Sequence, residues 1–173
     1  RGDIEEYLAF GSGEGYQSGF PNLDTLYTPD PGTVTVWTGI SGHGKSTFLN
    51  HYLLGVSKTH RIPFALFTPE NMPPRKFMVK LAEILLHKRY KKFEVGEFDL
   101  VSDFLSQSAI VVYPEDDMTI DRVLSLLRVT VLRHGVKMCV IDPWNMIEYS
   151  RPKDVSETEF ISMVMSRLGT FAK

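Results

Sequence analysis

Short apolar runs, separated by stretches with helical spacing, are the feature of this sequence that most constrains its fold. Four such runs, rich in β-branched and aromatic residues, occupy residues 33–38, 63–68, 109–113 and 137–141. Strands that are apolar on both faces are typical of parallel sheets covered by helices on both sides. We therefore predict an α/β fold with a mostly parallel sheet and helices on both of its faces.

The predicted helices fill the intervals between these runs. They cover residues 45–58, 96–106 and 156–173, with two more that open at Pro73–Pro74 and at the capping residue Thr119. Apolar side chains recur at helical spacing in the last two of these, and this spacing predicts which positions are buried. The predicted buried positions are Phe77, Leu81, Ile84, Leu85, Ile120, Val123, Leu124, Leu127 and Val131.

The first part of the chain differs in composition from the rest. Residues 1–31 are rich in Gly, Ser, Pro, Asp and Glu, so we predict a linker and lead-in segment there, followed by one domain over residues 32–173. Apolar residues between positions 4 and 10 fit either a short amphipathic helix or a frayed terminus. The chain begins with Arg1 and stops after a predicted helix, so we expect this domain to be truncated, with its C-terminal strands beyond the chain.

Charge and cysteine content exclude several classes of protein. The 173 residues carry 19 Lys+Arg against 21 Asp+Glu, which argues against a strongly basic nucleic-acid module. A single cysteine excludes an intramolecular disulfide and a Cys-rich zinc site, and it suits a reducing compartment. No apolar run approaches the ~18 residues needed to span a membrane, so no membrane partner is expected. We predict a cytoplasmic location, with the mitochondrion and the nucleoid as open alternatives.

The strongest chemical signal is the glycine-rich octapeptide GISGHGKS at residues 39–46. It fits the pattern G-x-x-x-x-G-K-[ST] at every fixed position, between a predicted strand and a predicted helix. Glycines let the backbone turn tightly, so that successive N–H groups face phosphate oxygens, and the helix adds the positive end of its dipole. The pattern predicts a site for a nucleoside triphosphate. The alternative is a glycine-rich turn without a ligand.

Each residue type in this motif has a predicted role. Lys45 places an ammonium group on the β- and γ-phosphates, and the Ser46 hydroxyl is a ligand for Mg²⁺. His43 occupies a free position of the motif, so it is expected to contribute its backbone alone. The predicted nucleotide-binding residues are Gly39, Ser41, Gly42, His43, Gly44, Lys45, Ser46 and Thr47, and the predicted ligands are ATP and Mg²⁺.

Two carboxylates follow predicted strands. Asp142 ends the apolar run MCVI, as in the Walker B pattern, and would hold Mg²⁺; the alternative is a carboxylate that caps the turn before Pro143. Glu70 follows the run FALFT at the edge of the sheet where parallel strands present ligands. It would act on the attacking water as a catalytic residue together with Lys45, or it would only stabilise the start of the next helix.

The run HKRYKK at residues 87–92 is the basic cluster of this sequence. It fits contact with nucleic-acid phosphates, and it also fits a solvent-facing helix C-terminus, where cations complement the helix dipole. The second interpretation is the preferred one.

Several segments together resemble a known family. Residues 19–50, the FTPEN segment and CVIDPWNMIE are similar, in this order, to the RecA-type ATPase domain of DnaB-like replicative helicases, including phage and mitochondrial Twinkle-type primase-helicases. The resemblance extends from about Ser18 to the end of the chain. Many ATPases share the glycine-rich motif, so the assignment to this particular family rests on the GF-P-x-LD turn and on Glu70. The family usually carries Asp-Tyr-Leu-Gln after Walker B, whereas this chain has DPWN. This departure favours a phage or prophage protein over a cellular one.

The resemblance also implies roles and partners. Lys45 and Ser46 would bind phosphate and Mg²⁺, Asp142 would be the Walker B aspartate, and Glu70 would activate water. The whole protein would be a homo-oligomeric ring, a hexamer, that moves on single-stranded DNA, with a possible primase module. The family's γ-phosphate sensor, DNA loops and arginine finger lie further on, so we expect poor ATP hydrolysis from this chain alone. The alternatives are a RecA- or circadian-clock-type ATPase, and a nucleotide-bound assembly module without useful hydrolysis.

Overall fold

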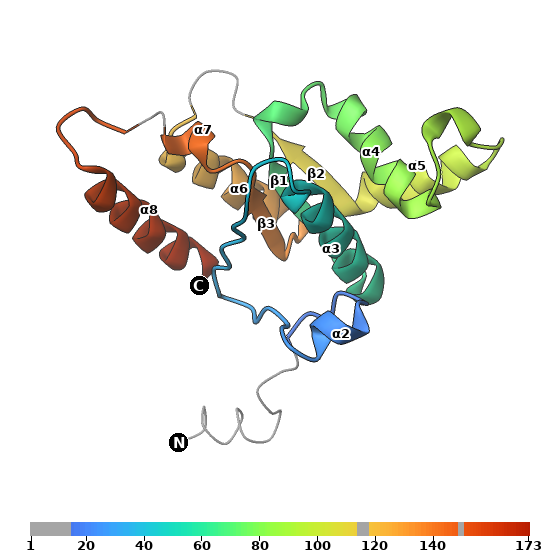
Figure 1. Cartoon of the computed structure of the whole chain (residues 1–173), viewed down its shortest axis with the longest axis horizontal. Coiled ribbons are helices and arrows are strands. Elements are labelled where there is room, and N and C mark those ends of the chain that lie inside the picture. The colour runs from blue at the N-terminus through green and yellow to red at the C-terminus, as the bar shows by residue number, and fades with distance from the viewer. Residues whose placement is uncertain (1–14, 114–117, 149–150) are drawn as a thin grey trace.

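A computed structural model of the chain describes residues 15–113, 118–148 and 151–173. The short amphipathic helix considered between positions 4 and 10 lies outside the described residues. The described part contains a parallel three-stranded sheet in the order β2-β1-β3, with helices on both sides (Figure 1). The strands are β1 (Phe64–Phe67), β2 (Ala109–Val112) and β3 (Met138–Ile141). The predicted α/β class and parallel pairing are confirmed.

Long helices occupy the predicted intervals. They are α3 (Lys45–His60), α4 (Pro74–Leu86), α5 (Glu97–Ser108), α6 (Ile120–His134) and α8 (Glu157–Ala172). Four single-turn elements were not predicted, because one turn is too short to show a period: α2 (Pro21–Asp24), η1 (Pro69–Asn71), η2 (Tyr90–Lys92) and α7 (Asn145–Glu148). Among the described residues, no helix is both long enough and apolar enough to cross a membrane.

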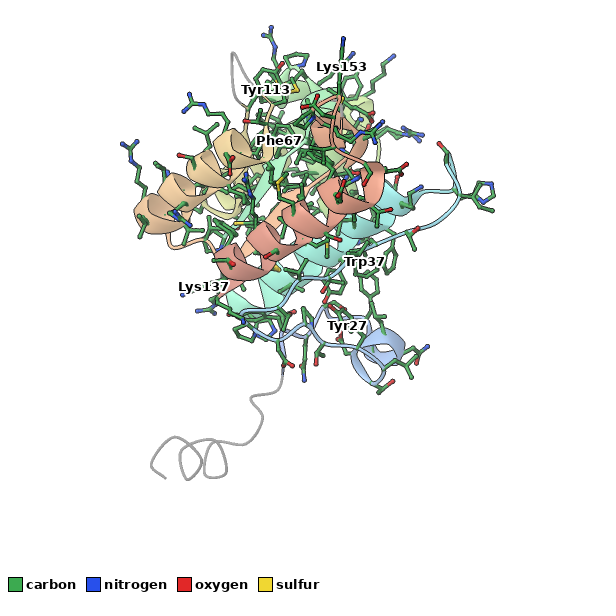
Figure 2. All side chains as sticks on the ribbon, turned by 90° about the vertical axis from the view of Figure 1, so that its left-hand side faces the viewer. Tyr27, Trp37, Phe67, Tyr113, Lys137 and Lys153 are labelled. Atoms are coloured by element: carbon green, nitrogen blue, oxygen red, sulfur yellow. The ribbon has the colours of Figure 1, made fainter. Side chains whose placement is uncertain are left out.

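The central strand β1 is buried on both of its faces. Phe64 and Leu66 pack in a core with residues of α3, α4 and α5, whereas Ala65 and Phe67 pack in a second core with residues of α6, α7 and α8. Phe67 accordingly lies in the interior of the molecule (Figure 2). Because successive side chains of a strand point to opposite faces, a four-residue apolar strand supplies both helical layers.

Helix starts follow local signals in the sequence. Pro73 is the N-cap of α4 and Pro74 occupies its first turn, as predicted. The Thr119 hydroxyl accepts a hydrogen bond from the Arg122 amide at 3.4 Å, as predicted for the start of α6. Ser156 and Glu159 form a reciprocal capping box at the start of α8. The predicted buried face of α6 is confirmed at Ile120, Val123, Leu124 and Leu127.

The predicted first strand, at residues 33–38, is wrong. This segment is exposed and pairs with no strand, and β3 pairs with β1 alone in the described sheet. The ring of Trp37 instead packs on α3, with centroids 5.4 Å from Phe48 and 5.3 Å from Tyr52. Trp37 also contacts Tyr27, and the two lie together away from Phe67 (Figure 2). β-branched composition favours an extended backbone, but pairing also needs a neighbouring strand, and here aromatic contacts hold the segment elsewhere.

A hydrogen-bonded turn occupies the lead-in segment from Gly15 onward. The Asp24 carboxylate accepts hydrogen bonds from the Ser18 amide at 2.7 Å, the Ser18 hydroxyl at 2.6 Å and the Gly19 amide at 2.9 Å. The turn contacts the last residue of α3, because His60 Nε2 lies 3.1 Å from the Gln17 carbonyl oxygen. These bonds tie the segment before the glycine-rich loop to the helix that follows the loop.

The turn also lies against the backbone of α3 at Gly55. A Cβ atom placed on Gly55 would lie 2.0 Å from the Ser18 carbonyl oxygen, which is far inside contact distance. Gly169 in α8 is the natural comparison, because a Cβ there would meet no atom within 4 Å.

Gly55→Ala is expected to lower the free energy of unfolding, and Gly169→Ala to raise it. Alanine is favoured over glycine inside a helix by up to ~1 kcal/mol, and this gain alone acts at Gly169. At Gly55 the added methyl group must displace the turn, and such overpacking costs ~1–3 kcal/mol. Denaturant unfolding of both variants measures the change in the free energy of unfolding and its sign in each. An increase of similar size in both would contradict the close approach of Ser18 to α3.

Asp24→Asn is expected to destabilise the protein near neutral pH and to have less effect in acid. Loss of solvent raises the pKa of Asp24, but hydrogen bonds from Ser18 and Gly19 outweigh this and hold the pKa below its ordinary value. The stabilising contribution is therefore full above the unfolded pKa and is lost as pH falls through the lowered folded pKa. Unfolding at pH 7 and near pH 3 tests this, with Asp103→Asn at an exposed position of α5 as the control. A deficit independent of pH would contradict an ionised Asp24.

Candidate functional site

The glycine-rich loop at residues 39–44 leads directly into α3 and is fully exposed. Gly42 has φ 78°, and Gly44, the N-cap of α3, has φ 84°. Glycine adopts such positive φ angles readily, whereas a residue with a side chain would be strained there. A Cβ at either position would meet no atom within 4 Å, so backbone conformation and not crowding requires glycine here. No side chain caps α3, and its first amides therefore face open space. Such a helix start suits an anion.

Lys45 folds back over this loop. Its ammonium nitrogen donates hydrogen bonds to the carbonyl oxygens of Gly39 at 2.8 Å and Ile40 at 3.1 Å. The cation is thus held beside the open helix start by weak neutral acceptors. Phosphate oxygens would be stronger partners for it, because charge-assisted hydrogen bonds are about twice as strong as neutral ones.

The remaining predicted residues of the loop are contiguous and exposed. The His43 amide lies 3.4 Å from the Ile40 carbonyl oxygen, which closes the loop on itself. The side chains of Ser46 and Thr47 lie in the first turn of α3 and are exposed. Ser41 is exposed as well, so the loop offers amides, hydroxyl groups and one ammonium group on a single surface.

The two candidate carboxylates lie at the carboxyl ends of adjacent strands. Glu70 is in η1, three residues after Phe67 ends β1. The Asp142 amide donates a hydrogen bond to the Phe67 carbonyl oxygen at 2.9 Å, which fixes the residue after β3 beside the end of β1. α3 begins toward the same end of the sheet and returns to the start of β1 (Figure 1). The topology therefore brings the loop, Glu70 and Asp142 to one edge of the sheet.

The carboxylates do not form a metal site by themselves. Within the described ranges, no group of three or more His, Cys, Asp and Glu residues is arranged to hold a metal ion. Mg²⁺ at nucleotide sites takes one or two protein ligands and completes its shell with phosphate oxygens and water. Ser46 and Asp142 carry oxygen donors of the kind that Mg²⁺ takes as ligands.

Sequence reasoning missed the aromatic support of the loop. Phe48 and Tyr52 lie one turn apart on α3, and both pack against Trp37, which lies two residues before the loop. Both ends of the loop are thereby held against one helix. Burial raises the pKa of Tyr52, whose hydroxyl group is buried and has no hydrogen-bond partner among the described residues. The spacing of Phe48 and Tyr52 in the sequence was the available signal.

Comparison with known proteins finds a distant relative. No protein-family profile matches the chain. It is 31% identical over 170 residues to the Twinkle homolog protein, chloroplastic/mitochondrial, of Arabidopsis thaliana. The match covers 92% of this chain but 24% of that protein, so the chain spans about a quarter of its relative. This distant homology supports a family-level relationship to the Twinkle-type proteins that the sequence resembles.

Proposed function

We propose that the chain is the ATP-binding and ATP-hydrolysing motor domain of a ring-forming replicative DNA helicase, of phage or prophage type. The observation that carries this proposal is the GISGHGKS loop before an uncapped α3, with the Lys45 ammonium held over the loop. Homology to a Twinkle homolog supports the helicase assignment over other ATPases. We accordingly assign the α/β domain to the RecA-like class, with this loop as its Walker A motif.

The loop residues hold the triphosphate in this proposal. Backbone amides at the start of α3 bind phosphate oxygens, and Lys45 leaves its two carbonyl partners for the β- and γ-phosphates. Ser46 and Asp142 would hold Mg²⁺, and the ion would supply positive charge beside the phosphates. The assigned nucleotide-binding residues remain Gly39, Ser41, Gly42, His43, Gly44, Lys45, Ser46 and Thr47.

Glu70 accepts a proton from the attacking water in this proposal. Two side-chain hydrogen bonds hold the turn that contains Glu70. The Asn71 side-chain amide donates to the buried Thr68 hydroxyl at 2.7 Å, and Lys80 donates to the Asn71 side-chain oxygen at 2.7 Å. A rigid turn suits a general base, because such catalysis depends on position and contributes ~10²–10⁴-fold.

Single-stranded DNA, a homo-oligomeric ring and a possible primase module are the proposed partners. They rest on the family relationship, because this chain spans 24% of its relative. Cytoplasmic location stays a prediction, with the mitochondrial and nucleoid alternatives.

Lys45→Ala is expected to abolish stabilisation by MgATP. At a hundredfold excess over the Kd, a ligand adds ~2.7 kcal/mol, which corresponds to roughly 5–10 °C in melting temperature for a chain of this size. Thermal unfolding with and without MgATP measures the shift. Lys58→Ala, which removes an exposed cation at the other end of α3, is the matched control and keeps the shift. An equal shift in the Lys45 variant would remove this residue from the site.

Glu70→Gln is expected to abolish ATP hydrolysis while leaving the MgATP thermal shift intact. Glutamine keeps the shape of the side chain but cannot accept the proton. Hydrolysis by the full-length protein is measured with and without single-stranded DNA, and Glu157→Gln at an exposed position of α8 is the control.

Three outcomes separate the proposed function from its alternatives. Stimulation by single-stranded DNA that is lost in Glu70→Gln supports the motor. Nucleotide binding without hydrolysis by the wild type supports an assembly module, and strand pairing without unwinding supports a recombinase-type ATPase. Unchanged hydrolysis in Glu70→Gln would leave this residue a structural role alone.

A further inference from the structure

A closed loop between α4 and α5, residues 88–97, projects beyond the ends of both helices (Figure 1); we name it the basic loop. α4 ends at Leu86 and His87 adopts a left-handed conformation with φ 52°. The basic run begins at the C-cap of α4, His87, and its residues from position 89 to 92 are exposed. The interpretation preferred from sequence, a solvent-facing helix C-terminus, fits this position. Lys91 and Lys92 lie further on, in η2, beyond the last turn of α4.

Carboxylates hold the basic loop from within. Glu97 accepts hydrogen bonds from the Lys88 ammonium at 2.6 Å and from the Glu94 amide at 2.8 Å. The Lys88 hydrogen bond lowers the pKa of Glu97. Glu83 on α4 accepts a hydrogen bond from the Tyr90 amide at 3.0 Å. Glu83 and Glu97 are thus occupied in closing the loop, whereas the Glu94 side chain is 82% exposed and lies at the limit of contact with Lys88, at 4.0 Å.

The basic loop and the residue after it carry exposed cations and exposed aromatic rings. Lys91 and Lys92 in η2 are exposed and form no ion pair within the described part of the chain. The Arg89 side chain is 84% exposed and lies at the limit of contact with Glu83, at 3.9 Å. Tyr90 is 54% exposed and Phe98, directly after the loop, is 53% exposed. The loop and Phe98 therefore present three cations, two aromatic rings and the Glu94 carboxylate to solvent.

We propose that the basic loop and Phe98 bind single-stranded nucleic acid. Arg89, Lys91 and Lys92 contact phosphates, while Tyr90 and Phe98 stack on unpaired bases. Such a combination of cations and aromatic platforms is how proteins bind single strands without sequence preference. A duplex would satisfy the cations but not the rings, because its bases are already stacked. An apolar protein partner would leave the three cations without partners.

This contact is separate from the nucleotide site. α4 begins near Glu70 and ends at the basic loop, and its 13 residues span about 20 Å. The proposed motor does not require the contact, and the contact does not require a bound nucleotide. The two proposals can therefore fail independently.

The test is binding of a fluorescent oligothymidylate to the intact chain without nucleotide at low salt. The double variant Lys91→Gln/Lys92→Gln is expected to bind more weakly. The slope of log affinity against log salt concentration should change from about −2 to about −0.7, because each phosphate contact contributes roughly −0.7. Lys137→Gln/Lys153→Gln removes the same charge from two exposed positions outside the basic loop and serves as the control (Figure 2). Tyr90→Ala should weaken binding about fivefold or more, and Tyr90→Phe should restore it.

Each other outcome would overturn the proposal. Equal weakening in the control variant would show a nonspecific charge effect. Binding of duplex as tight as that of the single strand would remove the role of the rings. Self-association lost in Tyr90→Ala, without oligonucleotide binding by the wild type, would make the surface a protein interface. Lys45→Ala is included as a further check, because it should lose the MgATP shift and keep oligonucleotide binding.

Discussion

Burial of β1 on both faces is the constraint on which the rest of the structure depends. Phe64 and Phe67 are fully buried on opposite sides of one strand, and burial of each such side chain contributes about 1.5–3 kcal/mol. The strand also hydrogen-bonds to both of its neighbours, so its carboxyl end is fixed in space. This end of β1 positions the two candidate carboxylates. Glu70 follows it in the chain, and the Asp142 amide donates a hydrogen bond to the carbonyl oxygen of Phe67, the last residue of β1.

The other half of the candidate site combines a firmly packed helix with an open loop. α3 packs Leu53 and Leu54 in one core with Phe64 and Leu66 of the sheet, while the residues that precede its first turn are exposed. Aromatic contacts of Trp37 and the turn closed by Asp24 hold the chain before the loop against the same helix. The loop is therefore free to meet a ligand although both of its ends are fixed.

Sequence predicted those features that depend on local pattern. The helical spacing of apolar residues predicted the long helices, and Thr119 was recognised as the N-cap of α6. The motif at residues 39–46 predicted the glycine-rich loop. The topology rule for parallel strands brought Glu70 and Asp142 to one edge. Features that depend on tertiary competition were not predictable: the packing of Trp37 on α3 in place of strand pairing, and the carboxylates of Glu83 and Glu97 that close the basic loop.

The open side of β3 has a consequence for handling the protein. Four apolar residues, Met138–Ile141, form a strand whose described pairing is on one side alone, and each is only half-buried. A strand edge of this kind is a template for a strand from another molecule. Concentrated samples should therefore self-associate through backbone hydrogen bonds between strand edges. This association should increase in high salt, because salt screens the charge of Lys137 beside the strand.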